Sequence, residues 1–186
     1  ILGLCKPAAF HIPANSRKQR TKHLFKSIGM VSTEQLYQKF LECTGVSTDT
    51  RRITPGCLFV ALKGDKFDGN QFVEQALASG ARYALVDDAD VAARESLAGS
   101  CLLVADALTA LQDLARHHRQ TFTFPVIGLT GSNGKTTTKE LIAGVLSKKY
   151  RTYATVGNLN NHIGVPLTLL AINDQYEMAV VEMGAN

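Results

Sequence analysis

The chain has 186 residues, of which 45% are hydrophobic, so it can bury a core in one domain or in two small ones. Its net charge is +4, but residues 1–30 hold six Lys or Arg and no Asp or Glu, which leaves 14 basic and 16 acidic side chains elsewhere. A body so close to neutral, without a base-reading or stacking motif, argues against nucleic acid as a partner.

The first 29 residues are polar and basic, and they show little periodicity before Met30. Their apolar residues precede their charges, which is the reverse of the order in a secretory signal. We expect residues 1–29 to be an extension outside the fold, with Met30 as the natural start. A targeting peptide is the alternative.

The first readable helix begins after Ser32, which can cap it while Gln35 reaches back, and Leu36, Phe40 and Leu41 form its apolar stripe. Strand-like segments then alternate with helical ones, the strands at 57–62, 83–86 and 101–105 and the helices at 71–78, 91–97 and 108–118. This alternation predicts an α/β fold with a largely parallel sheet.

A second unit starts near residue 122, beyond which Pro125 marks a boundary. It comprises a strand at 126–129, a helix at 135–148 and a buried strand at 179–183. The helix is expected to pack against the sheet through four apolar residues on one face: Leu141, Ile142, Val145 and Leu146.

Between that strand and that helix, residues 128–138 read Gly-Leu-Thr-Gly-Ser-Asn-Gly-Lys-Thr-Thr-Thr. Glycines let backbone N–H groups turn toward phosphate oxygens, and the helix N-terminus adds partial positive charge. Lys135 can reach the outer phosphates, and the Thr136 hydroxyl can bind Mg²⁺. The usual spacing would place the first glycine where Leu129 stands, so a chance glycine-rich turn is the alternative to an ATP site.

Two later segments carry polar chemistry. Residues 179–182 form an apolar strand ending in Glu182, where a nucleotide-binding sheet places an acid for magnesium; the alternative is an ordinary surface Glu. Residues 156–170 group three amides and an imidazole between glycines, which suits sugar hydroxyls and phosphate oxygens. A polar turn entering a helix at Pro166 explains the same segment equally well.

The cysteines Cys5, Cys43, Cys57 and Cys101 are too scattered for a zinc site and suit a reducing cytosol. No apolar stretch reaches the roughly 18 residues of a membrane span. We therefore expect a cytoplasmic protein, and a monomer, with no membrane partner.

Several of these segments resemble the Mur ligases. The matching residues are 130–137, 157–170 and 182–186, and 47–51, 55–64 and 67–69 resemble the family's UDP-substrate domain. Within the family, the amide-rich loop and the Glu-Met-Gly-Ala-Asn ending point to the member that adds D-alanyl-D-alanine. Many relatives have His where this chain has Asn70, so no role is carried over there.

The resemblance, which covers residues 31–186, implies an α/β fold in which a small N-terminal Mur-ligase substrate domain (30–121) precedes the start of a P-loop-type parallel-sheet ATPase domain (122–186). The chain is then an N-terminal fragment, inactive alone. The intact enzyme would use ATP and Mg²⁺ in cytoplasmic peptidoglycan synthesis. ATP would phosphorylate the terminal carboxylate of UDP-N-acetylmuramoyl-tripeptide, and the amine of D-alanyl-D-alanine would attack the resulting acyl phosphate.

The resemblance also implies the site residues. ATP would be held by seven of them: Gly131, Ser132, Asn133, Gly134, Lys135, Thr136 and Thr137. Magnesium would bind Thr136 and Glu182. Lys135 and His162 would be catalytic, with His162 near the metal. The UDP-sugar substrate would meet Asn160 and Asn161, and its uridine end would meet Thr48, Asp49 and Arg51, although Asp49 could equally cap a turn and Arg51 pair with it.

Two other functions stay open at this point. The chain could be a nucleotide- or UDP-substrate-binding module without turnover, because its later metal ligands and C-terminal domain are missing. It could also belong to a sister ligase that adds a different amino component, although the Asn-Leu-Asn-Asn loop argues against that.

Overall fold

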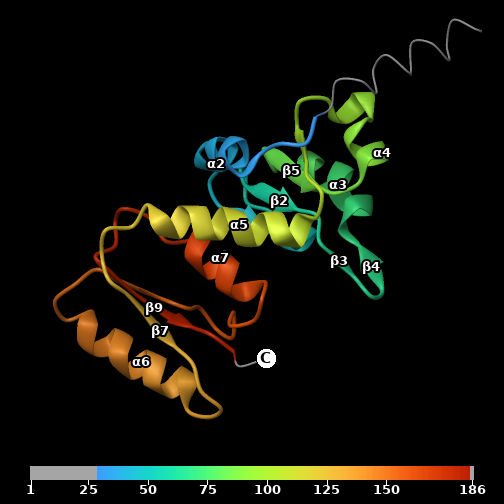
Figure 1. The fold of residues 1–186 in the computed structure, drawn as a ribbon. Helices are drawn as coiled ribbons and strands as arrows, with labels where there is room; N and C mark the ends of the chain where they lie inside the picture. Colours follow the sequence, from blue (N-terminus) through green and yellow to red (C-terminus); the bar gives the residue numbers. More distant parts are fainter. Residues whose placement is uncertain (1–28, 185–186) are drawn as a thin grey trace, which may run out of the picture.

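The computed structural model describes residues 29–184, so the extension expected at residues 1–29 lies outside the described part except for Gly29. Within this part, the chain forms two parallel sheets covered by helices (Figure 1). The α/β class inferred from the alternating pattern is confirmed. No helix among residues 29–184 is both long and apolar enough to cross a membrane.

The first sheet has four parallel strands in the order β1-β2-β5-β6. They are β1 (Val46–Ser47), β2 (Leu58–Val60), β5 (Tyr83–Val86) and β6 (Cys101–Leu103). The helices that cover it are α2 (Thr33–Leu41) and α5 (Ala107–Gln120) on one face and α3 (Val73–Ala78) and α4 (Ala89–Ala92) on the other.

Alternation along the strands explains these layers. Leu58 and Val60 share a buried cluster with α2 and α5, whereas Phe59 between them belongs to the cluster with α3 and α4. At the start of α2, Ser32 accepts from the Gln35 N–H and the Gln35 side chain accepts from the Ser32 N–H, so the capping box is confirmed.

Short elements complete this unit. They are a hairpin of β3 (Lys63–Gly64) and β4 (Phe67–Asp68) and the 3₁₀ turns η1 (Thr50–Arg52), η2 (Gly69–Phe72) and η3 (Glu95–Leu97). The single helix expected at 91–97 is wrong, because extended backbone at Arg94 separates α4 from η3.

The second sheet has three parallel strands in the order β7-β9-β8: β7 (Val126–Leu129), β9 (Met178–Glu182) and β8 (Thr152–Ala154). Helices α6 (Lys135–Leu146) and α7 (Gly164–Leu170) lie on opposite sides of it (Figure 1). Ala179 and Val181 of β9 pack with Val165 and Leu169 of α7, and Val180, which is also fully buried, points the other way.

The expected packing face of α6 is wrong in part. Leu141 and Val145 are 66% and 72% exposed, whereas Lys139 is buried and Ile142 is partly buried. A helix turns about 100° per residue, so a face centred on Lys139 and Ile142 directs Leu141 and Val145 outward. Leu41 of α2, expected in the apolar stripe, is also exposed.

Helix α5 connects the two sheets, because α7 packs along it (Figure 1). Leu170 of α7 belongs to the same buried cluster as Leu111 and Leu114 of α5. In addition, the buried ring of His118 on α5 has Nε2 2.8 Å from the carbonyl oxygen of Ile172, just after α7. The second sheet is therefore held against the first through α5 and α7.

Candidate functional site

The glycine-rich loop leaves the carboxyl end of β7 and enters α6. Gly134 occupies the N-cap with φ +76° and ψ 0°, and Gly131 has φ +144°, so both adopt backbone conformations that side chains disfavour. The Lys135 ammonium folds back and donates to the Gly131 carbonyl at 2.6 Å. Lys135 therefore lies over the loop, next to the exposed Ser132, Asn133 and Gly134.

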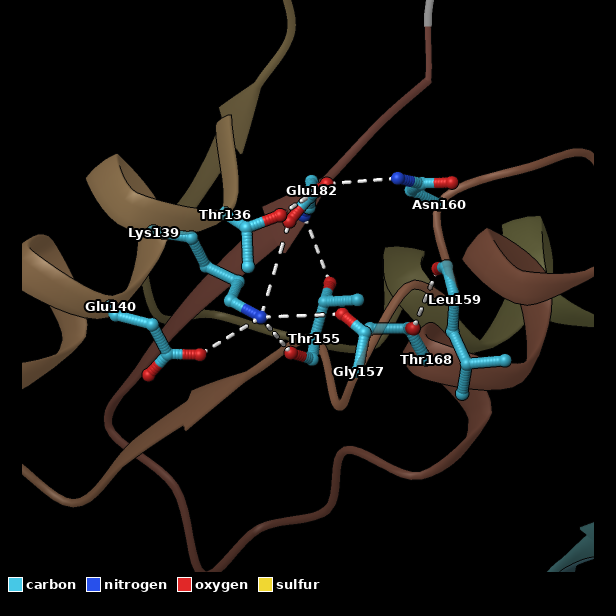
Figure 2. Close-up of polar contacts among 9 residues, drawn as sticks. All are labelled: Thr136, Lys139, Glu140, Thr155, Gly157, Leu159, Asn160, Thr168 and Glu182. Atoms are coloured by element: carbon cyan, nitrogen blue, oxygen red, sulfur yellow. Dashed lines mark hydrogen bonds and ion pairs between the residues drawn. The ribbon is translucent and has the colours of Figure 1, made fainter. Parts of the chain in front are cut away.

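Three of the expected site residues meet at the end of β9 (Figure 2). The Oε1 atom of Glu182 accepts from the Asn160 side-chain amide at 2.8 Å and from the Thr136 hydroxyl at 3.3 Å. These residues come from the amide-rich loop, from β9 and from the first turn of α6. Parallel pairing sets Leu129 beside Glu182, which brings the carboxylate to the edge of the sheet where the glycine-rich loop begins.

The donor set at Glu182 fits magnesium bound together with a nucleotide. Glu182 is 1% exposed, and its Oε2 atom has no hydrogen-bond partner among the described residues. A buried carboxylate oxygen without a partner is costly, and Mg²⁺ prefers carboxylate and hydroxyl oxygens. Thr136 and Glu182 offer these two groups side by side, so the ordinary surface carboxylate considered for Glu182 is wrong.

The buried Lys139 was missed by the sequence reasoning. It is 1% exposed, and its ammonium donates to the Thr155 carbonyl at 2.7 Å, pairs with Glu140 at 3.0 Å and lies 3.9 Å from Glu182 Oε2 (Figure 2). Its position one helical turn beyond Lys135 and Thr136 was the available signal, because residues three and four apart share a face.

Two asparagines of the amide-rich loop make different contacts within the protein. Asn161 Oδ1 accepts from the N–H groups of Ile163 at 3.1 Å and Gly164 at 2.7 Å, so Asn161 initiates α7. The helix thus begins just before Pro166, as the turn interpretation expected. Asn160 instead directs its amide nitrogen toward Glu182 (Figure 2).

His162 is exposed, and its carbonyl accepts from the Gln112 side chain of α5 at 3.1 Å. It lines a cavity of about 420 Å³ between α5 and the loop. The described lining residues are Gln112, Arg116, Asn160, Asn161, His162, Val165, Pro166, Met183 and Gly184. Gln112 and Arg116 were not anticipated from the sequence, which carries no local signal for them.

Thr48, Asp49 and Arg51 line a different cavity, of about 540 Å³, together with three aromatic side chains: Phe59, Phe67 and Phe72. Asp49 accepts from the Arg51 backbone N–H at 3.0 Å and pairs with its guanidinium at 2.7 Å, and Arg51 holds the pKa of Asp49 at about 2. The capping and pairing roles considered for them therefore occur in the wall of this cavity, away from the glycine-rich loop.

Asn70 is buried at the edge of this region. Its side-chain nitrogen donates to Asp68 and to Asp87, each at 2.8 Å, and Lys63 pairs with Asp87 at 2.9 Å. The side chain is thus part of a polar network that fixes the β3–β4 hairpin to the end of β5.

Two family models match the chain. The model described as "Mur ligase family, catalytic domain" matches residues 42–119, and the model described as "Mur ligase middle domain" matches residues 129–186. The first range holds all four strands of the first sheet, and the second holds β8, β9 and the last residue of β7.

The curated relatives are ligases. The UDP-N-acetylmuramoyl-tripeptide--D-alanyl-D-alanine ligase of Bacillus subtilis is 46% identical over 168 residues, 90% of this chain and 36% of the relative. The Escherichia coli enzyme of the same name is 49% identical over 76% of this chain and 30% of its own length. The chain thus spans about a third of the length of these relatives.

Solved structures agree with this match. MurF from Acinetobacter baumannii is 36% identical with a TM-score of 0.69, covering 85% of this chain and 36% of that structure. MurF ligase from Thermotoga maritima, solved in complex with ADP, is 34% identical with a TM-score of 0.67, covering 78% of this chain and 33% of that structure.

Proposed function

The chain belongs to the Mur ligase family, and we propose that it supplies the UDP-substrate and ATP sites of a ligase that joins D-alanyl-D-alanine to UDP-N-acetylmuramoyl-tripeptide. The curated relatives of that name and the ADP complex of a structural neighbour support this proposal. The structural observation that carries it is the convergence of Thr136, Asn160 and Glu182 beside a glycine-rich helix N-terminus.

The division of labour follows the two sheets. We assign residues 30–121 to the uridine end of the UDP-linked substrate, and residues 122–186 to ATP and to the rest of that substrate. The cavity at Thr48, Asp49 and Arg51 suits the uridine end, because it combines aromatic walls with polar edges. Asn160, Asn161 and His162 face a second cavity, which we assign to the sugar and its attached peptide. The enzyme is proposed to act in the cytoplasm as a monomer.

The nucleotide part is assigned by chemistry. Gly131, Ser132, Asn133, Gly134 and Thr137 would present backbone and hydroxyl groups to phosphates, and the N-terminus of α6 favours negative charge there. Thr136 and Glu182 would hold Mg²⁺ through oxygen atoms. When bound, ATP supplies the phosphoryl group and Mg²⁺ the charge that lets two anions approach.

Lys135 would leave the Gly131 carbonyl and neutralise the phosphate oxygens as charge develops. The tripeptide carboxylate would then displace ADP from phosphorus, and the amine of D-alanyl-D-alanine would displace phosphate from the acyl carbon. Amide formation thus releases one ADP and one phosphate for each dipeptide added. His162 is positioned on the substrate cavity as a candidate group near the reacting carboxylate.

The test is phosphate release by the full-length protein that contains this chain. Release should require UDP-N-acetylmuramoyl-tripeptide, D-alanyl-D-alanine, ATP and Mg²⁺ together, and Lys135→Ala should lower it at least about 100-fold. Turnover with a different amino component would reveal a sister ligase. Binding of ATP and of the UDP-substrate without turnover would leave only the binding module.

A further inference from the structure

Lys139 is a fully buried cation on the inner face of α6 that no step above uses. Burying an ammonium is costly unless its donors find partners, and here they reach the Thr155 carbonyl at 2.7 Å and Glu140 at 3.0 Å, with the Gly157 carbonyl at 3.5 Å. Glu140 is 68% exposed, so the partners inside the protein are mainly backbone carbonyls and Glu182.

The carbonyls of Thr155 and Gly157 lie between the end of β8 and the amides of the amide-rich loop. Thr155 follows β8 and opens the amide-rich loop, and Gly157 turns the backbone with φ +59° just before Asn158. The same Thr155 accepts from the Glu182 N–H through its hydroxyl at 2.9 Å. Lys139 therefore joins the second turn of α6, just after the glycine-rich loop, to the start of the amide-rich loop.

Asn160, five residues after Thr155, also lies beside Glu182. Asn160 donates to Glu182 Oε1, and its carbonyl accepts from the Gly184 N–H. Residues 155–160 thus form an arch: its first residue is bonded to Lys139 and its last to Glu182. Figure 2 shows both contacts. Because both ends of this arch are bonded, Asn160 is held in one orientation although residues 155–160 form no helix or strand.

We propose that Lys139 is a positioning residue for the UDP-linked substrate: its ammonium ties the phosphate-loop helix to the start of the loop that carries Asn160. The inference rests on the proposed function, because it takes Asn160 as a substrate contact. It extends that function by coupling the substrate loop mechanically to the nucleotide helix. Lys139 touches neither substrate nor the reacting atoms.

Replacing Lys139 should weaken binding of the UDP-linked substrate and leave nucleotide binding nearly unchanged. In Lys139→Met the stem is kept but the donors are lost, so the start of the arch keeps its bonds to β9 and loses its contact with α6. Loss of hydrogen bonds from a charged group corresponds to about 10-fold to 100-fold in affinity, and we expect a loss in this range for the UDP-linked tripeptide. ADP measured without Mg²⁺ should bind within about threefold of wild type, because the loop 130–134 keeps its own contacts.

The experiment compares the full-length wild type, Lys139→Met and Glu140→Gln by calorimetry with UDP-N-acetylmuramoyl-tripeptide and with ADP, and by steady-state KM and kcat. Glu140→Gln is the matched control, since it removes the exposed partner of the same ammonium and should change neither affinity. A selective loss of UDP-substrate affinity, with KM raised more than kcat is lowered, supports the proposal. Equal losses for both ligands, or none, overturn it.

Removing Lys139 leaves Glu182 as a buried charge without compensation, which can prevent folding. In that event Lys139→Met/Glu182→Gln is compared with Glu182→Gln alone, again by UDP-substrate calorimetry, which needs no metal. The double variant should bind about tenfold more weakly or worse than Glu182→Gln; equal binding overturns the inference. A wild type that does not bind the UDP-substrate overturns the proposed function as well.

Discussion

His118 joins the two sheets, and replacing it with Phe tests how firmly they are held together. The Phe ring keeps the edge contacts with Phe40 and Phe122 but loses both hydrogen bonds, the one to the Ile172 carbonyl at 2.8 Å and the one with the Tyr37 hydroxyl at 3.2 Å. Because Ile172 is buried, its unpaired carbonyl costs about 1–3 kcal/mol, and the half-buried hydroxyl costs about 0.5–1.5 kcal/mol. We expect the free energy of unfolding to fall by about 2–4 kcal/mol.

The contribution of His118 to the free energy of unfolding should also depend on pH. Burial lowers the pKa of His118, with the bond to Ile172 acting the other way, and the neutral ring needs its proton on Nε2 to donate to that carbonyl. The unfolded histidine titrates near about 6.5, so below that pH the unfolded state binds a proton that the folded state resists. The stability supplied by neutral His118 is therefore present above about pH 6.5 and is lost on acidification.

Urea unfolding at about pH 7.5 and about pH 5.5 measures both effects. Carboxylates also contribute to the acid dependence, so the informative quantity is the difference between wild type and His118→Phe at each pH. We expect this difference to shrink at the lower pH. Tyr37→Phe, which removes only the weaker bond, should cost about 1 kcal/mol. A variant as stable as wild type, or a difference that grows in acid, would refute the reasoning.

Two further predictions concern the site and α6. Thr136→Val removes the hydroxyl that meets Glu182, so the Mg²⁺ concentration for half-maximal turnover should rise about tenfold or more, whereas Thr136→Ser should stay near wild type in the same titration. If Thr136→Val needs the same Mg²⁺ concentration as wild type, Thr136 is not a ligand of the metal. Leu141→Gln should change the free energy of unfolding by under about 0.5 kcal/mol, against about 2–5 kcal/mol for the buried Leu111→Ala. Comparable losses in urea unfolding would show that Leu141 is packed.

Local signals in the sequence were sufficient for the larger elements. The capping box at Ser32, the strand at 83–86 and the strand at 126–129 are all found where patterning predicts them, because residues near in sequence determine them. The hairpin of β3 and β4 and strand β8 have two or three residues each, too few for a period to show. In addition, β8 pairs with β9, which is distant in sequence, whereas β3 and β4 pair with each other across residues 65–66.

The candidate site also contains residues that local sequence predicts and one that it does not. The order of glycines, Lys135 and Thr136 predicts a phosphate loop, and the apolar strand before Glu182 predicts a carboxylate at a sheet edge. Lys139 could not be identified from composition, because lysine is rarely buried and is expected on a solvated face. Its burial becomes favourable through the carbonyls of Thr155 and Gly157, which the three-dimensional path of the loop places there, together with the carboxylates of Glu140 and Glu182.

The amide-rich loop is contacted from both halves of the molecule. On one side Gln112 of α5 donates to the His162 carbonyl, and on the other Lys139 of α6 donates to Thr155. Since α5 also bonds to the end of α7 through His118, the loop and the helix that follows it are bounded by groups from both sheets. The position of the loop at His162 therefore depends on how the two sheets are set against each other, which links the contact at His118 to this side of the candidate site.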